Sequence, residues 1–166
     1  MGKLWFKKKS SLHGSGLFAS TNIKKGEQVI EYIGDKVTKK EGDKRAEKQI
    51  KKAQKNKSKG MVYVFELNKK YDIDGGVTRN YARFINHSCN QNCEVEITNN
   101  QIWISSIKRI KKGAELLYNY GYPFDSDFED HICKCGSKKC VGYILSDDDW
   151  PKLKRALNKK KSTSTK

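Results

Sequence analysis

Residues 82–93 place an amide, an imidazole and a thiol directly after an apolar pair. Asn86, His87 and Cys89 supply these groups, and Phe84 and Ile85 precede them. The apolar side chains can anchor the backbone in a core, while the polar groups can bind a ligand. A solvated loop rarely needs all three groups, so we expect the functional site to lie here.

Three further cysteines, Cys133, Cys135 and Cys140, stand close together late in the chain. A closed set of four thiolates around zinc is a structural site, whereas a catalytic zinc keeps one position open for water. We therefore predict that Cys89 and the late cysteines bind one structural zinc ion, which ties the end of the chain to Asn86 and His87. An alternative remains, because a CxC pair is less typical of zinc sites than CxxC. In it, Cys89 is a buried small apolar residue and only the late cysteines bind metal.

Four segments resemble, in the same order, the motifs of SET-domain protein lysine methyltransferases, and together they span residues 12–145. One segment alone would be weak evidence, but four in the family's order are specific. The segments are the cofactor-like loop HGSGLF at 13–18, the NHSC-like RFINHSC at 83–89 with Asn92-Cys93, the ELxYDY-like ELLYNY at 115–120, and the post-SET-like CKCGSKKC at 133–140 with Gly142-Tyr143.

The resemblance implies a mainly β fold with short helices. Small sheets would surround a knot-like active-site core, and a zinc-stapled post-SET segment would follow. Together with the composition, it divides the chain into four parts. These are a basic N-terminal arm at 1–10, a SET domain at 11–122, a post-SET zinc segment at 123–145, and a C-terminal helix with a basic tail at 146–166.

The resemblance also implies an activity, S-adenosylmethionine-dependent N-methylation of protein lysines. Tyr120 would orient the reacting amine and methyl group, and Tyr118 would share the lysine pocket. A tyrosine rather than a phenylalanine at position 118 implies mainly mono- or dimethylation. The residues implied to hold the cofactor are His13, Ser15, Gly16, Tyr63, Asn86, His87 and Lys134.

Histone tails, with histone H3 favoured, are the implied substrate. Two alternatives remain open. One is a lysine methyltransferase of non-histone proteins such as ribosomal proteins. The other is a non-catalytic, zinc-stapled module that binds chromatin, although such a module would not need Asn86, His87 and Tyr120 together.

Charge is the strongest signal in the composition. The chain has 35 Lys and Arg against 19 Asp and Glu, a formal net charge of +16, which favours anionic partners such as nucleosomal DNA. The segment 36–59, with eleven basic and three acidic residues, is a helix-prone insertion that could contact DNA or merely solvate the surface. Few aromatic residues interrupt the lysine runs, so a stacking platform for single-stranded nucleic acid is not expected.

The sequence also bears on location. No apolar run is long enough to cross a bilayer, and the start lacks the apolar stretch of a secretory signal. Four of the five cysteines are assignable to metal, which indicates a reducing compartment. We expect no membrane partner. We expect the protein to act on chromatin in the nucleus, or to be a viral or bacterial protein that acts on host chromatin. Cys93 is left over, and we expect it to pack in the core.

Local patterns predict the remaining elements. Asn tolerates positive φ, so Asn99-Asn100 predicts a hairpin turn. Ile23–Gly26 and Ile110–Gly113 share the pattern Ile-Lys-Lys-Gly, which predicts two similar turn-and-strand units. Ser146 and Asp149 resemble a capping box, and Asn158 suits a helix end. The predicted elements are strands at 29–33, 61–67 and 116–122, a surface strand at 71–74 entering an Asp-Gly turn, hairpin strands at 94–98 and 101–106, and a helix at 146–157.

Overall fold

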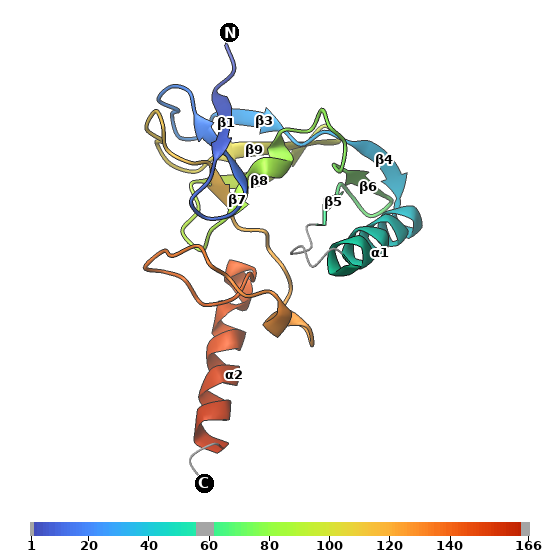
Figure 1. The fold of residues 1–166 in the computed structure, drawn as a ribbon, viewed down its shortest axis with the longest axis vertical. Coiled ribbons are helices and arrows are strands. Elements are labelled where there is room, and N and C mark those ends of the chain that lie inside the picture. Colours follow the sequence, from blue (N-terminus) through green and yellow to red (C-terminus); the bar gives the residue numbers. More distant parts are fainter. Residues whose placement is uncertain (1, 56–61, 164–166) are drawn as a thin grey trace.

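The computed structural model describes residues 2–55 and 62–163 and contains small sheets, two helices and long connections (Figure 1). In these residues the strands form two two-stranded and two three-stranded sheets. This arrangement confirms the prediction of a mainly β fold with few helices. No helix in the described ranges is long and apolar enough to cross a membrane.

The first sheet pairs β1 (Trp5–Lys9) antiparallel with β2 (Ser15–Ala19). The register places Lys9 opposite Ser15 and Trp5 opposite Ala19. Gly14, in the connection, has a φ of +52°, a left-handed conformation that costs glycine little. The basic N-terminal arm is therefore a strand that lies against the loop expected to hold a cofactor.

The central sheet has the order β3 (Gln28–Glu31), β9 (Gln101–Ser106) and β8 (Cys93–Thr98). Asn99 and Asn100 have φ values of 51° and 58°, as a type I′ turn requires. The predicted hairpin is confirmed. This sheet contributes the apolar centre of the molecule, where Ile102 and Ile104 are almost fully buried among residues of the other strands.

A third sheet has the order β4 (Asp35–Thr38), β6 (Tyr71–Asp74) and β5 (Val64–Glu66), and α1 (Lys39–Lys55) packs on it. The insertion predicted at 36–59 thus starts as a strand, because Val37 is buried in β4, and becomes helical at Lys39. Its last residues, and Met61 of the predicted strand 61–67, lie outside the described residues.

Polar contacts attach α1 to this sheet. Lys39 Nζ lies 2.6 Å from Asp72 Oδ1, and Arg45 donates to Asp74 Oδ2 at 3.1 Å. Gly42 makes the close approach possible, since a Cβ there would lie 2.3 Å from Asp72 Oδ2. The predicted strand at 71–74 is confirmed as β6, but it does not lie wholly at the surface, because it is the central strand of its sheet and Asp72 is buried beside Lys39.

The two Ile-Lys-Lys-Gly segments pair with each other. Ile23 and Ile110 form an antiparallel bridge through reciprocal N–H···O bonds of 2.9 Å. Gly26 and Gly113 have the same φ of 81°. The segments are therefore two similar turns, each leading into a strand: β3 after the first and β10 (Leu117–Tyr118) after the second. The predicted strand at 116–122 is regular only over these two residues.

The C-terminal region consists of two 3-10 turns, Phe128–Asp130 and Asp147–Asp149, and the helix α2 (Trp150–Thr163), which projects from the body (Figure 1). Leu153 is buried with Phe128 and Leu145, and Trp150 and Leu157 of the same helix pack against this cluster. The capping-box prediction was wrong, because Ser146 makes no side-chain cap and Asp149 instead accepts bonds from Phe124 N–H and Lys152. The helix also continues past Asn158.

Candidate functional site

A parallel pair of two-residue strands positions residues 82–93, which we call the central segment. β7 (Asn86–His87) lies beside β10, with His87 opposite Tyr118. Ser88 N–H donates to the Tyr118 carbonyl at 3.2 Å. A 3-10 turn, Ala82–Phe84, leads into β7, and the buried Ile85 anchors it in the core. The predicted role of the apolar pair as an anchor therefore applies to Ile85 most clearly.

Asn86 fastens the loop 13–16 to this segment. Its buried Nδ2 donates to the carbonyls of His13 and Ser15, both at 3.3 Å, and to Glu115 Oε1 at 2.8 Å. Gly16 lies so near Glu115 that a Cβ would be 2.3 Å from Oε1. The amide thus fixes the course of a loop whose His13 side chain is exposed. The structure brings together four of the predicted cofactor residues.

Glu115 was not among the predicted site residues, although it begins the ELLYNY segment. Its side chain joins Asn86 to the loop 13–16, and its backbone forms an isolated β-bridge with Phe18 of β2. The available signal was an acidic residue at the start of a strongly apolar run. A carboxylate in such a place usually has a specific partner.

His87 connects the tyrosines to the cysteines. Its Nδ1 accepts a hydrogen bond from Tyr120 N–H at 3.2 Å, and its Nε2 lies 3.6 Å from Cys89 Sγ. Burial lowers the pKa of His87 to about 4, against a smaller opposite effect of Asp147, so the ring is neutral near pH 7. A neutral ring that accepts at Nδ1 carries its proton on Nε2, and this N–H points at the sulfur.

Tyrosine rings surround one small region beside β7. The rings of Tyr118 and Tyr120 lie 5.0 Å apart, and Tyr118 is also near Phe65. Tyr120 Oη donates to the Ile85 carbonyl at 3.1 Å, which leaves the oxygen lone pairs free to accept. Burial raises the pKa of Tyr118 and of Tyr120, so both phenols remain neutral. The arrangement is a cluster of aromatic rings in which the Tyr120 hydroxyl is held by the Ile85 carbonyl.

Tyr32 connects the backbone of Tyr63 to this aromatic cluster, because the Tyr32 ring lies 5.2 Å from Phe65. Tyr32, a buried residue that was assigned no role from sequence, donates from its hydroxyl to the Tyr63 carbonyl at 2.9 Å. Gln49 of α1 accepts from Tyr63 N–H at 2.8 Å. The helix α1 therefore holds the backbone of Tyr63, the residue directly before β5.

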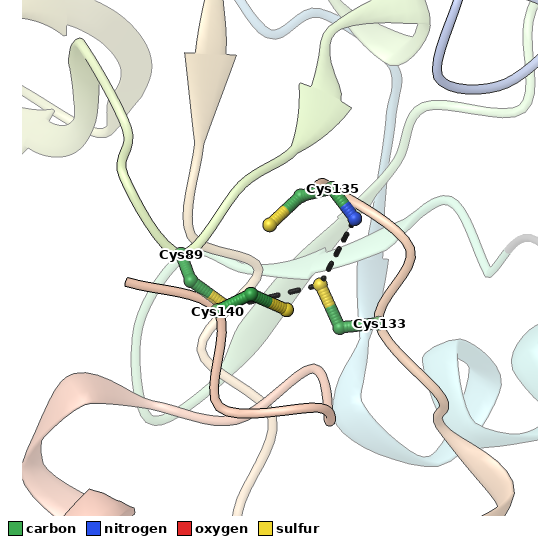
Figure 2. A group of neighbouring side chains, drawn as sticks. All are labelled: Cys89, Cys133, Cys135 and Cys140. Atoms are coloured by element: carbon green, nitrogen blue, oxygen red, sulfur yellow. Dashed lines mark hydrogen bonds between the residues drawn. The ribbon is translucent and has the colours of Figure 1, made fainter. Parts of the chain in front are cut away.

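Four cysteine sulfurs meet between the central segment and the C-terminal region (Figure 2). The Sγ atoms of Cys89, Cys133, Cys135 and Cys140 all lie within 4.8 Å of one another, and those of Cys89 and Cys133 are 3.7 Å apart. Sulfurs bound at about 2.3 Å to a tetrahedral zinc ion lie about 3.8 Å from each other. The cluster could therefore hold zinc in a closed site, and Cys89 belongs to it.

The environment of the sulfurs favours a bound cation. Burial raises the pKa of Cys89 to about 11 and also raises that of Cys133. Burial acts against Cys135 too, but hydrogen bonding with Ser137, whose Oγ lies 3.4 Å from the sulfur, outweighs it and lowers the pKa of Cys135 to about 6. Several buried thiolates repel one another unless a positive ion compensates their charge. A metal ion held by the four sulfurs would supply that charge.

Two other predicted residues lie apart from these contacts. Lys134, between two of the cysteines, has an exposed side chain. Cys93 is completely buried in the main core, and burial raises its pKa to about 12. Cys93 is therefore a packing residue, as expected, and is not part of the sulfur cluster.

Comparisons with known proteins agree with this geometry. Histone-lysine N-methyltransferase set-2 of Caenorhabditis elegans is 36% identical over 154 residues, covering 87% of this chain and 10% of that protein. A histone-lysine N-methyltransferase, H3 lysine-4 specific, of Emericella nidulans is 35% identical over 141 residues, covering 82% and 11%. A putative histone-lysine N-methyltransferase 1 of Plasmodium falciparum is 39% identical over 140 residues, covering 81% and 2%.

The chain thus spans about a tenth or less of the length of these curated relatives. The sequence profile of the SET domain matches residues 14–121. This range includes residues 14–16 of the loop, β7, Tyr118 and Tyr120. The profile match covers more than half of the chain, and the relatives share over a third of their aligned residues with it. This chain belongs to the SET domain family.

Proposed function

We propose that this chain is an S-adenosylmethionine-dependent protein lysine N-methyltransferase that acts on histone tails, with histone H3 favoured. The observation that carries the proposal is the packing of the Tyr120 ring against Tyr118 and His87, next to Asn86, whose amide fixes the loop 13–16. The relatives support the substrate class, since they are named histone-lysine N-methyltransferases and one is named H3 lysine-4 specific.

The loop 13–16 fits the proposed cofactor. Its backbone is fixed by Asn86, and Gly16 lets the Glu115 carboxylate lie against the loop. When bound, S-adenosylmethionine supplies a methyl group on a positively charged sulfonium. His13, Ser15 and Gly16 would hold it mainly through the backbone, together with Tyr63, Asn86 and His87. The exposed Lys134 would cover its adenine end.

In the proposed mechanism, the tyrosine rings form the pocket that receives the substrate amine and favours its neutral form. A lysine ammonium, with an unperturbed pKa of about 10.4, has no lone pair with which to attack. Aromatic walls disfavour the charged form by desolvation, so the amine enters neutral. The Tyr120 hydroxyl donates to Ile85, and its lone pairs can accept an amine N–H and orient the nitrogen. Catalysis is then chiefly alignment at near-attack distance.

Tyr118 sets the proposed product. Its hydroxyl group occupies the pocket next to Tyr120 and, with a water molecule, takes space that further methyl groups would need. We expect mainly mono- or dimethyllysine. Tyr118→Phe should shift the product toward higher methylation, read by mass spectrometry at early turnover. Dominant trimethyllysine from the unmodified protein would contradict this proposal.

The proposed zinc ion has a structural role. Cys89, Cys133, Cys135 and Cys140 would hold it as thiolates, and the neutral His87 would donate its Nε2–H to the Cys89 sulfur. Outer hydrogen bonds of this kind orient metal ligands. The ion would thereby connect the post-SET segment to Asn86 and the tyrosine pocket, without taking part in the reaction.

The proposed place of action is chromatin in the nucleus, including host chromatin for a viral or bacterial protein. Lys40, Lys44 and Lys48 form an exposed row at four-residue spacing on α1. This row could contact nucleosomal DNA beside the tail, because it faces away from the sheet on which α1 packs.

The decisive experiment measures transfer of labelled methyl from S-adenosylmethionine to histone tails and to whole-cell lysate proteins. Tyr120→Phe should lower kcat about 100-fold, since the amine loses its orienting group. Tyr71→Phe, at an exposed tyrosine on β6, is the matched control and should leave kcat unchanged. If lysate proteins take up the label and histone tails do not, a non-histone substrate is favoured. No transfer at all would favour the chromatin-binding module.

A further inference from the structure

Three aromatic rings from two distant parts of the sequence form a row beside β1. We call Trp5, Tyr81 and Phe84 the aromatic row. The ring centroids of Trp5 and Tyr81 are 5.1 Å apart, and those of Tyr81 and Phe84 are 6.4 Å apart. Tyr81 is 41% exposed. The strand β1, which carries Trp5, lies at the opposite end of the molecule from α2 (Figure 1).

Three cations lie over these rings. Lys3 Nζ is 5.2 Å and 5.6 Å from the centroids of the first two rings, and Lys7 Nζ is 3.8 Å from the last. The Arg83 guanidinium carbon is 4.9 Å from that same ring. Among the described residues none of the three forms a salt bridge, and Arg83 Nε is buried without a hydrogen-bond partner. The row therefore combines one exposed ring, that of Tyr81, and two half-buried rings with uncompensated positive charge.

We propose that the aromatic row binds single-stranded nucleic acid, with bases stacked on the rings and phosphates paired with Lys3, Lys7 and Arg83. Stacking of a base on an aromatic ring is stronger than an exposed cation–π contact. A base can therefore take a ring face while the flexible ammonium group turns to the adjacent phosphate. The few aromatic residues among the lysine runs did not favour such a platform, but Tyr81 and Phe84 reach Lys3 and Lys7 from a distant segment.

The geometry distinguishes this ligand from other anions. In a duplex the bases already stack on one another, so a duplex would use the cations but not the rings. An acidic peptide would likewise pair with the cations and leave Tyr81 exposed. The rings of the row are tilted by 35° and 58° to their neighbours, which suits the separated bases of a single strand.

Fluorescence anisotropy of a labelled oligothymidylate tests the proposal on the full chain. Tyr81→Ala should weaken binding about tenfold, and Tyr81→Phe should retain it, because a phenyl ring still stacks. The matched control is Tyr71→Ala. Tyr71 is 37% exposed and has its own cation, Lys36, at 4.3 Å, but it lies on β6 outside the row. This variant should bind as well as the unmodified protein.

The charge contribution has its own test. Lys7→Gln should lower the slope of log affinity against log salt by about 0.7, the value for one phosphate of a single strand. Lys36→Gln removes the same charge elsewhere and should leave the slope unchanged. If Tyr81→Ala does not fold, as judged by circular dichroism, Lys3→Gln with Lys7→Gln tests the same surface without altering a ring.

Three results would overturn the proposal. The first is a duplex of the same length that binds as tightly as the single strand. The second is an equal loss of binding in the Tyr71 and Tyr81 variants. The third is displacement of the oligonucleotide by polyglutamate at equal charge, which would identify a general anion surface or an acidic protein partner.

Discussion

The sheet region and the C-terminal region are held together by different means. In the described residues, the sheet region buries fourteen residues in one apolar cluster, whereas the C-terminal cluster buries only Phe128, Leu145 and Leu153. A cluster of three cannot offset the conformational entropy of ordering residues 123–157. The four sulfurs supply what the second region lacks, a fixed point to which its chain can be tied.

Removing the metal should give the largest effect. We expect a chelator, or Cys133→Ser, to release one zinc per chain, lower methyl transfer at least about 100-fold and expose residues 123–157 to protease. The β8–β9 hairpin should keep its hydrogen-exchange protection, because its core is apolar. Metal analysis by mass spectrometry, limited proteolysis and hydrogen exchange check this. If the hairpin also loses its hydrogen-exchange protection when the metal is removed, the two regions do not unfold independently.

A substitution in the apolar core should have the opposite effect: it should destabilise the sheet region and leave zinc binding intact. Ile104 is fully buried on β9, so Ile104→Ala should lower the free energy of global unfolding by about 2–5 kcal/mol. The folded fraction should still bind one zinc ion. Chemical denaturation with a parallel zinc assay measures both quantities. If the folded fraction takes up less than one zinc, the metal site depends on the core more directly than we infer.

A substitution in the small cluster should act on the second region alone. Leu153 is 2% exposed, and Leu153→Ala should destabilise the zinc-loaded C-terminal region by roughly 2 kcal/mol. Chelator-treated protein should show no difference, because this region is then already unfolded. Pro151→Ala is the control, since its side chain is exposed on the same helix. Proteolysis rates with and without metal provide the measurement.

The smallest effect is expected at Cys93, the cysteine that belongs to the core rather than to the sulfur cluster. Cys93→Ala should cost roughly 1 kcal/mol of stability and leave zinc stoichiometry and methyl transfer unchanged. Denaturation and metal analysis of this variant, next to Cys133→Ser, separate packing from metal binding. A lowered zinc content would assign Cys93 to the metal site.

Local chemistry explains which parts of the fold were predictable. The Asn99-Asn100 turn was predictable because positive φ is a property of the residues themselves. The sulfur cluster was predictable because zinc requires a known number and type of ligand. The start of the C-terminal helix was misjudged, since the acceptor role of Asp149 depends on Phe124, a residue distant along the chain.

Long-range contacts explain what was missed at the site. The link from Asn86 to Glu115 joins residues 29 apart in sequence, and the hydrogen bond from Tyr32 to Tyr63 joins residues 31 apart. The buried position of Asp72 likewise depends on Lys39, 33 residues earlier. No local pattern encodes such pairs, because each depends on how the sheets pack.

The sequence by itself determined the chemistry of this protein: the thiols, the amide, the imidazole and the tyrosines, in an order that identifies the family. The tertiary structure alone decided which of these groups meet and what surrounds them. It paired Tyr81 with Trp5, brought Glu115 to Gly16 and placed Lys39 on Asp72. The physical reason is that residue type and short-range spacing fix the reactivity and the turns, whereas burial and long-range contacts exist only once the sheets have packed.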